Sequence, residues 1–402
     1  MNRRGMAVVV GGGIGGLAAA IGLHRIGWKV TVLERLPVLD DAGAGISLQA
    51  NGLRALDALG VGDSVRGAGA EQGSGGIRTP SGRWLARMDM ARAGARLGSA
   101  VYSFHRARLH ETLRGHLPVG QLVTGAQVTG VRDGEEGAVV EYEGDSGVQT
   151  VRADLVVGAD GVHSRTRRAV CPDAPGPEFT GTTVWRAVTD WPVAGQADID
   201  QTWGPGLEFG STRLPGGFVE WHALTEEPLA VPAGNLMDEV RPRFGHWHDP
   251  IPALLDATAP GTVLRHDVFA LDTPLPTFVS GRLVLLGDAA HAMTPHLGQG
   301  ASQALEDAVV LAAALHSAAN TASALAHYDT VRRPRAQAVA KAARRTGRVG
   351  HRVRTPLALA LRNTLIRATP AGLALGQMVK HAAWTPPSLP TRTEQATRRT
   401  YT

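Results

Sequence analysis

Apolar residues in the first part of the chain fall into short runs separated by glycine-rich turns. Residues 7–10 form a β-branched run that predicts a buried strand, and residues 17–23 form an alanine- and leucine-rich run that predicts a helix. Residues 28–33 then predict a second strand. This order of strand, helix and strand is typical of an α/β fold.

Two later apolar runs end in a similar way. Residues 153–157 and 281–286 each predict a strand, and each leads directly into a turn that contains glycine and aspartate. The second turn is followed by another glycine-rich turn and by a predicted helix over 301–318.

The pattern changes between residues 179 and 270, where short segments alternate apolar and polar positions. Turn signals such as residues 214–217 separate them, which predicts an antiparallel sheet. Aromatic residues concentrate here, and we expect some to line a pocket although ordinary sheet packing explains any single one: Trp185, Trp191, Trp203, Trp221 and Trp247.

The C-terminal part predicts helices and a tail. Residues 321–346 and 355–384 are alanine- and leucine-rich, and Leu357, Leu361 and Leu365 form a stripe at four-residue spacing. We expect these helices to pack against the N-terminal strand–helix domain. The alternative is contact with a membrane surface. Residues 385–402 predict a flexible tail.

The glycines after the first strand carry a recognisable spacing. Gly11, Gly13 and Gly16 fit G-x-G-x-x-G, in which the first permits a tight turn, the second admits a pyrophosphate and the third lets helix and strand approach. Glu34 lies about 20 residues further on, where a ribose hydroxyl needs an acceptor. The spacing predicts a dinucleotide site but does not separate FAD from NAD.

Composition narrows the class of protein. The chain has 402 residues and is 43% hydrophobic, enough to bury a sizeable core. Its single cysteine, Cys171, excludes an intramolecular disulfide and any multi-cysteine metal site, and it suits a cytoplasmic protein. The uncharged run over 7–23 contains six glycines, which suit neither a signal peptide nor a membrane span.

Charge is distributed unevenly. The whole chain has a formal net charge of +5. Residues 331–402 hold 15 Lys and Arg and one acid, whereas the rest of the chain has a negative net charge. We expect a solvated basic face over the acidic body. Contact with an anionic membrane or nucleic acid is the alternative, and the chain shows no nucleic-acid motif.

Three motifs together resemble one enzyme family. The motifs are the glycine loop, the stretch GADGVHSRTR at 158–167 and the stretch GDAAHAMTPHLGQGASQALEDA at 287–308. In this order they resemble the motifs of the single-component FAD-dependent aromatic hydroxylases, a para-hydroxybenzoate hydroxylase-like family. Residues 43–60 and 104–113 are similar to its salicylate hydroxylase-like branch. The resemblance covers roughly residues 5–345.

The resemblance implies a Rossmann-like α/β FAD-binding domain with an inserted mixed or antiparallel substrate sheet and C-terminal helices. It places the FAD-binding domain at 1–71, 102–178 and 271–350, and the substrate domain at 72–101 and 179–270. A helical segment at 351–384 and the flexible tail at 385–402 follow. No second G-x-G-x-x-G occurs, so NAD(P)H is expected to bind transiently.

Motif and resemblance together assign the contacts with non-covalent FAD. Asp160 has an alternative role as a helix cap, and Arg106 an alternative role in a surface ion pair. The expected cofactor residues are Gly11, Gly13, Ile14, Gly15, Gly16, Glu34, Arg35, Arg106, Asp160, Asp288, Pro295, Gly298, Gln299 and Gly300.

Three residues are candidates for substrate chemistry. His222 on the predicted sheet and His296 beside the GQG turn are candidate bases, and Arg186 is a candidate anchor for a substrate carboxylate. Each has an ordinary structural alternative, a packed histidine or an ion-paired arginine.

The resemblance implies a monooxygenase that uses NAD(P)H and O2 and acts through a flavin C4a-hydroperoxide. We expect an aromatic or other electron-rich small molecule as substrate, a bulky apolar compound of secondary metabolism. We also expect a monomer or homodimer. Alternatives of the same fold are an epoxidase of an alkene or indole and a prenyl-chain reductase. An alternative of another class is a non-catalytic, membrane-associated flavin scaffold.

Overall fold

A parallel sheet forms the centre of one half of the molecule. The computed structural model describes residues 5–38, 44–195, 197–226, 234–350, 352–370 and 379–390. The six strands of this sheet, in spatial order, are β18 (Val279–Ser280), β19 (Leu283–Leu285), β12 (Leu155–Gly158), β1 (Met6–Val10), β2 (Lys29–Leu33) and β8 (Leu122–Val123). All neighbours are parallel except β18 and β19.

The strands predicted at 7–10, 28–33, 153–157 and 281–286 are therefore confirmed, and all four lie side by side. Because β19, β12 and β1 are adjacent and parallel, the turns that follow them meet at one edge of the sheet.

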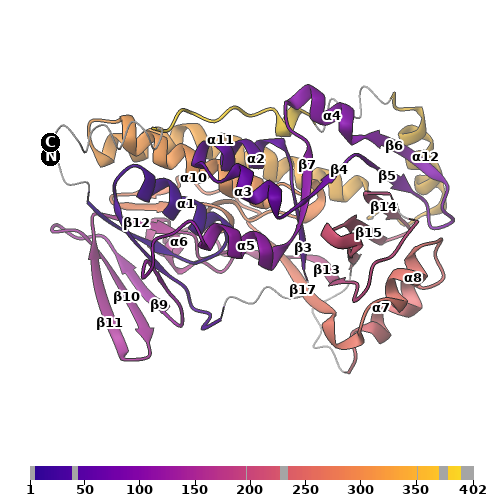
Figure 1. Cartoon of the computed structure of the whole chain (residues 1–402), viewed down its shortest axis with the longest axis horizontal. Helices are drawn as coiled ribbons and strands as arrows, with labels where there is room; N and C mark the ends of the chain where they lie inside the picture. The colour runs from indigo at the N-terminus through magenta and orange to yellow at the C-terminus, as the bar shows by residue number, and fades with distance from the viewer. Residues whose placement is uncertain are drawn as a thin grey trace.

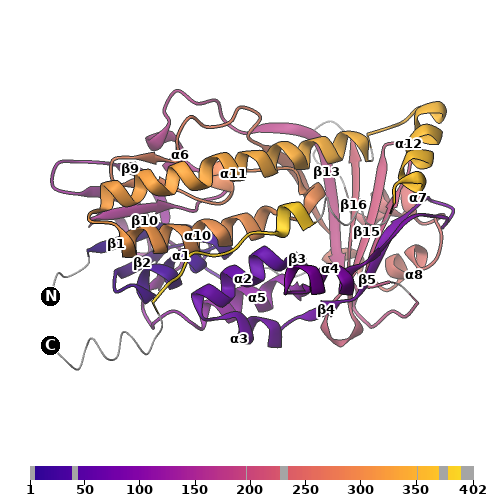
Figure 2. The same ribbon diagram turned by 90° about the horizontal axis from the view of Figure 1, so that it is seen from above.

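Helices cover this sheet in layers. Helix α1 (Ile14–Arg25) packs on α10 (Gly300–Ser317), which in turn packs on α2 (Ala50–Leu59) and on the long α11 (Thr321–Val349). Figure 2 shows α10 and α11 running together along the molecule. The helix predicted over 321–346 is confirmed. A separate meander extends below the parallel sheet in Figure 1 and consists of β9 (Gln127–Arg132), β10 (Ala138–Gly144) and β11 (Gly147–Ala153).

A second, larger sheet forms the other half of the molecule (Figures 1 and 2). Its spatial order is β17 (Leu264–Ala270), β13 (Glu178–Val188), β16 (Val219–Glu226), β15 (Leu207–Arg213), β14 (Ile199–Trp203), β5 (Ser74–Arg78) and β6 (Trp84–Asp89). All pairs are antiparallel except β14 with β5, so the expected mixed sheet is confirmed. The domain boundaries themselves stay a prediction.

The two faces of this sheet differ because side chains alternate along each strand. Trp185, Trp221 and Phe209 point to one face and pack against α7 (Met237–Phe244) and α8 (Ile251–Asp256) in a core of their own. The opposite face carries polar side chains. The tryptophans of this core follow the ordinary packing alternative, whereas Trp191 is 54% exposed.

A small third sheet and several short helices connect the two halves. The sheet has the order β3 (Gly45–Leu48), β7 (Val101–His105) and β4 (Ala70–Gln72). The remaining helices are α3 (Gly62–Gly67), α4 (Met90–Leu97), α5 (Arg106–Arg114), α6 (Arg165–Val170), α9 (Asp288–His291) and α12 (Pro356–Ala368).

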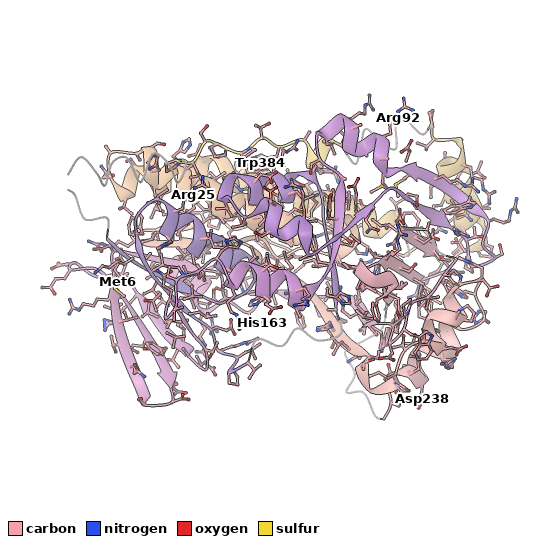
Figure 3. All side chains as sticks on the ribbon, viewed as in Figure 1. Met6, Arg25, Arg92, His163, Asp238 and Trp384 are labelled. Atoms are coloured by element: carbon pink, nitrogen blue, oxygen red, sulfur yellow. The ribbon has the colours of Figure 1, made fainter. Side chains whose placement is uncertain are left out.

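Two expectations for the C-terminal part are wrong where the structure describes it. Helix α12 packs against β6 of the larger sheet rather than on the FAD-binding half, and its leucine stripe faces outward. The predicted flexible tail is ordered over 385–390, because Trp384 and Leu389 pack on the main core and Arg25 Nε donates to the carbonyl of Pro390 at 2.9 Å (Figure 3). Residues 371–378 and 391–402 lie outside the described residues.

Candidate active site

The loop between β1 and α1 has the backbone of a tight phosphate-binding turn. Gly11 has a φ of +103°, and a Cβ there would lie 2.4 Å from the carbonyl oxygen of Ala159. A Cβ on Gly16 would lie 2.0 Å from the carbonyl oxygen of Gly11. Both positions therefore require glycine, because a side chain there would clash with a backbone carbonyl of the protein.

Gly13 differs from these two because it borders open space. Its φ of −68° suits any residue, yet a Cβ there would meet no protein atom within 4 Å. The first N–H groups of α1 next to it precede the first intrahelical bond, from Leu17, and remain available to an anion. The side chain of Ile14 is buried, so Ile14 offers only its backbone. A Cβ on Gly15 would lie 2.9 Å from Leu286, so Gly15 serves helix packing.

Glu34, at the end of β2, is tied to the glycine loop. One carboxylate oxygen accepts from the Gly12 N–H at 2.7 Å and the other from the Leu36 N–H at 2.9 Å. Each oxygen keeps a further lone pair, which suits a ribose hydroxyl. The next residue, Arg35, is exposed.

His110 is a supporting residue that the sequence did not single out. Its Nε2 lies 2.5 Å from the carbonyl oxygen of Gly12, and its side chain is buried on α5. His110 follows Arg106 by one helical turn. That spacing is the only sequence signal that places it near the loop.

The turn after β12 is organised around Asp160. Its carboxylate accepts from Ser164 Oγ at 2.6 Å and from the Arg165 N–H at 2.7 Å, so Asp160 has the capping role that was the alternative to cofactor contact. Arg167 is buried and donates to the carbonyls of Val162 and Ala289. This arginine joins the turn after β12 to the turn after β19.

The turn after β19 presents an unengaged carboxylate. Asp288 is exposed at the start of α9, and within the described residues it makes no hydrogen bond or ion pair. Gly287 before it has a φ of +59°, and its N–H donates to the carboxylate of Asp307 at 2.9 Å. The loop backbone is thus held from inside while Asp288 points outward.

The start of α10 is fixed by a buried side chain. Gln299 is 2% exposed; its amide donates to Gln49 Oε1 at 2.7 Å, and its oxygen accepts from Asn51 at 2.9 Å. Gly298 before it is left-handed, with a φ of +58°, and a Cβ on Gly300 would meet nothing within 4 Å. The first N–H groups of α10 therefore open, like those of α1, onto free space.

Pro295 and His296 lie in the short 3-10 turn Pro295–Leu297 that leads to Gln299. The ring of His296 packs against α11, where a Cβ on Gly347 would come within 2.5 Å of Cε1. His296 is therefore held between the turn and the long helix.

The polar face of the larger sheet carries one transverse row of side chains. Arg186, His222, Gly210 and Gln201 are register partners on β13, β16, β15 and β14, so they share one face. The His222 ring lies over Gly210, where a Cβ would be 2.1 Å from Nε2, and that nitrogen lies 3.4 Å from the Gln201 amide nitrogen. The structure thus brings two predicted substrate residues, Arg186 and His222, into one row.

Glu220 balances the charges of this row. It is 4% exposed, with one oxygen 3.2 Å from Arg186 Nη2 and the other 3.4 Å from His222 Nδ1. Burial would raise the pKa of Glu220, but His222 and Arg186 together hold it below its ordinary value. Burial would likewise lower the pKa of His222, but the Glu220 carboxylate outweighs it and raises that pKa.

This face points at the FAD-binding half rather than at solvent. Arg186 Nη2 donates to the carbonyl of Gly45 on β3, and a Cβ on Gly45 would lie 2.5 Å from Glu220 Cβ. Burial lowers the pKa of His266 on β17, and the positive charges of Arg186 and Arg106 lower it further. Arg106, at the start of α5, is therefore close to both the glycine-loop region and the polar row.

The three turns suit FAD by the chemistry of their donors. Two helix starts offer free N–H groups next to glycines that face open space, which suits a pyrophosphate and a polar ring edge. Glu34 and Asp288 offer carboxylate lone pairs for hydroxyl groups. All of these groups follow strands of one parallel sheet, where open α/β sheets bind their ligands.

Comparison with known proteins agrees with this geometry. Residues 5–206 and 270–343 match the family described as FAD binding domain. The chain belongs to this family. It is 39% identical over 351 residues to the aurachin C monooxygenase/isomerase of Stigmatella aurantiaca, covering 87% of this chain and 90% of that protein. It is also 33% identical over 393 residues to the salicylate hydroxylase of Pseudomonas putida, covering 89% and 88%.

A solved structure also agrees with the FAD-binding fold. HpxO of Klebsiella pneumoniae, crystallised with FAD and uric acid, superposes with a TM-score of 0.87 at 26% identity, covering 95% of this chain and 97% of that one. The protein is an FAD-dependent monooxygenase, as the three motifs predicted. No helix in its described residues is long and apolar enough to cross a membrane.

The monooxygenase also contains a buried charge network that sequence analysis missed. Arg332 on α11 is fully buried; its Nε lies 2.7 Å from Asp307 and its Nη1 lies 2.5 Å from Glu306. Asp307 also accepts from the Gly287 N–H and lies 2.6 Å from His291 Nε2. Burial would raise the pKa of Asp307, but Arg332 and His291 lower it to about 2.

The second acid of this network reaches the other cofactor turn. Glu306 accepts from Asn51 at 2.7 Å, and Asn51 also holds the Gln299 side chain. Arg335 pairs with both oxygens of Glu306. The network therefore fixes the turn at Gly287 and the turn at Gln299 against the same long helix. Glu306 and Asp307 lie within the stretch 287–308, so the sequence signal was present but only as part of a motif.

Proposed function

We propose that this monooxygenase hydroxylates an uncharged aromatic or heteroaromatic ring that carries a hydroxyl or N–H group, bound between the polar row of the larger sheet and FAD. The observation that carries the proposal is the pairing of Arg186 with Glu220, since a neutralised guanidinium is a poor anchor for a substrate carboxylate. Relatives are named for ring compounds, among them urate and salicylate.

Bound FAD would supply the redox chemistry, the uptake of reducing equivalents from NAD(P)H and the transfer of one oxygen atom of O2 to the ring. Gly13, Glu34, Asp288 and the start of α10 at Gly300 would hold it. The sheet then has to orient the ring and exclude water, because positioning is the main contribution of the protein to this chemistry.

His222 is our candidate for the proton acceptor. Its Nδ1 faces Glu220 and its Nε2 faces the row, so a carboxylate that accepts a hydrogen bond from Nδ1–H keeps the proton on Nδ1 and leaves the Nε2 lone pair for a substrate O–H or N–H. The raised pKa of His222 makes it a stronger base. Gln201, whose Oε1 is buried without a partner, would accept a second hydrogen bond from the ring.

The test compares ring compounds in pairs that differ only by a carboxylate, such as a hydroxyquinoline and its carboxylic acid. Purified FAD-loaded enzyme is given each compound with NADPH or NADH, and reductant oxidation and product mass are followed. We expect the uncharged members to stimulate oxidation and to yield products one oxygen atom heavier. Stimulation by the carboxylates alone would overturn the substrate class.

Product mass, together with the reactivity of the product toward a thiol, separates the alternatives of this fold. A prenyl-chain reductase would add two hydrogen atoms and no oxygen, and an epoxide would differ from a phenol by its reaction with a thiol. A scaffold would show no stimulation by any compound. The cytoplasmic location and the monomeric or dimeric state stay predictions.

A further inference from the structure

Helix α12 leaves three of its leucines exposed to solvent and buries an arginine, the reverse of what these side chain types usually do. Its inward face carries Arg362, which is 5% exposed, whereas Leu357, Leu361 and Leu365 on the outward face are 83%, 59% and 60% exposed. Leucines at four-residue spacing lie on one side of a helix, so the three form a continuous apolar stripe. Figure 2 shows α12 at the outer end of the larger sheet.

The inward arginine fixes this orientation. Arg362 Nη1 donates to the carbonyl of Gly350 at 2.6 Å, and its Nη2 lies 3.4 Å from the carbonyl of Trp203. The guanidinium also lies 5.7 Å from the centre of the Trp203 ring. Rotating the helix to bury its leucines would break these contacts and leave the charge unsatisfied.

Exposed leucines are otherwise scarce in this protein. Among the described residues, Leu36 is the only other leucine with a largely exposed side chain. Val349, at the end of the preceding helix α11, is also 59% exposed. The three leucines and Val349 lie close together, since Arg362 of α12 binds the carbonyl of the neighbouring Gly350, and such clusters mark interaction surfaces.

The surroundings of the stripe are strongly basic. Residues 341–370 contain eight Lys and Arg and no acid. Arg344 pairs with Asp272, Arg352 and Arg354 pair with Glu226, and Arg362 is buried, which leaves four exposed cations, Lys341, Arg345, Arg348 and Arg367. Strand β6, which α12 contacts, and the helix α4 that follows it lie in a stretch, 78–96, with five arginines and one acid. Figure 3 shows Arg92 of α4 projecting from the molecule. The partner of the stripe must therefore tolerate or attract positive charge.

We propose that the outward face of α12, with the arginines around it, docks the monooxygenase onto an anionic lipid bilayer without crossing it. A bilayer surface meets both requirements, since it buries an apolar stripe and attracts basic side chains. With 13 residues, α12 is too short to span a membrane, which needs about 20.

A second copy of the chain fits this surface less well. A twofold contact places the same patch on both subunits, so the arginines near α12 would face one another. Like charges across an interface oppose association. The charge of the patch thus favours an anionic surface over self-association. This inference does not rest on the proposed substrate class.

The experiment is co-sedimentation of the FAD-loaded full chain with vesicles. Vesicles of phosphatidylcholine are compared with vesicles of phosphatidylcholine and phosphatidylglycerol in equal parts. We expect binding to the anionic vesicles that weakens with salt and that is at least about tenfold weaker to the neutral ones.

Two variants and one control locate the contact. Leu357→Gln with Leu361→Gln and Leu365→Gln should weaken binding by about tenfold or more, and Arg348→Gln with Arg367→Gln should weaken it and reduce its salt dependence. The control, Val119→Gln with Val148→Gln, changes exposed valines elsewhere and should bind like wild type. Flavin absorbance confirms that each variant is folded and loaded.

Several outcomes would overturn the proposal. Failure of the wild type to bind anionic vesicles is one, and binding of the leucine variant that equals binding of the control is another. If the wild type is a dimer that the leucine variant converts to a monomer, with no vesicle binding by either, the face is an interface between copies. If neither vesicle binding nor a dimer is found, an acidic protein partner remains and the lipid proposal fails.

Discussion

The Nε atom of Arg332 lies 2.7 Å from a carboxylate oxygen of Asp307, and neither side chain is accessible to solvent. The pair joins α11 to α10 directly behind the turn at Gly287, whose N–H binds the same carboxylate. A charge pair in this position fixes a cofactor turn from the protein interior, and its loss leaves an uncompensated buried charge.

Acid should therefore destabilise the enzyme through Asp307. Its pKa is lowered from 3.8 to about 2 in the folded protein, so the stability it contributes, roughly 2 kcal/mol, is present above about pH 4. That contribution is lost as pH falls from about 4 through about 2. Urea unfolding of the apoprotein at a series of pH values measures it.

The substitution Asp307→Asn tests the same pair near neutral pH. It leaves Arg332 buried and unpaired on one side, and we expect a loss of about 3 kcal/mol in the free energy of unfolding. The loss should shrink at acid pH, where the wild-type carboxyl is itself protonated. An unchanged difference between wild type and variant across the pH series would contradict the assigned role.

Substitutions at the second and third glycines of the motif should have different effects. Gly13→Ala adds a methyl group that meets no protein atom, so the apoprotein should keep its stability while its affinity for FAD falls by about tenfold or more. Gly16→Ala would place a Cβ 2.0 Å from the carbonyl of Gly11 and should destabilise the apoprotein itself. Flavin titration and thermal unfolding, run side by side, separate the two effects.

Asn51 should matter for cofactor binding although its side chain is buried away from solvent. It bridges Gln299 and Glu306, so Asn51→Leu removes one of the hydrogen bonds that hold the Gln299 side chain, and we expect FAD affinity to fall by about tenfold. Gln149→Leu, which removes a hydrogen bond to Tyr142 in the separate meander, is the matched control. Equal FAD affinities of the two variants would rule out a positioning role.

Turnover should depend on the protonation of His222. Because Glu220 raises the pKa of His222 above its ordinary 6.5, the rate should increase with pH through a midpoint above 6.5. His222→Gln should lower kcat by about a hundredfold and remove this dependence. Glu220→Gln should move the midpoint downward, since burial and Arg186 then lower the pKa of His222 and only Glu208 still raises it. The measurement is product formation, separated from uncoupled NAD(P)H oxidation.

Local patterns made the parallel sheet and its turns predictable. The strand at 7–10, the glycines after it and the strand at 28–33 are neighbours in sequence, so their apolar runs and turn chemistry describe them without reference to the rest of the chain. The adjacent strands at 155–158 and 283–285 could be identified in the same way, because each is a short apolar run before a glycine.

The buried charges and the last helix were not predictable in this way. Arg332 pairs with acids 25 and 26 residues away along the chain, and a charged residue in a helical pattern indicates a solvated face by default. Leu357, Leu361 and Leu365 predict a buried stripe for the same reason. Only the tertiary contacts of Arg362 with Gly350 and Trp203 reverse that expectation.

The order of assembly follows from where β19 and the C-terminal residues lie. The N-terminal strand and glycine loop are completed by β19, by α10 and by residues 384–390, whose end is hydrogen-bonded to Arg25 of the first helix. Pairings this distant in sequence form late. A growing chain on the ribosome consequently carries its nucleotide loop before the residues that close the site around it have been made.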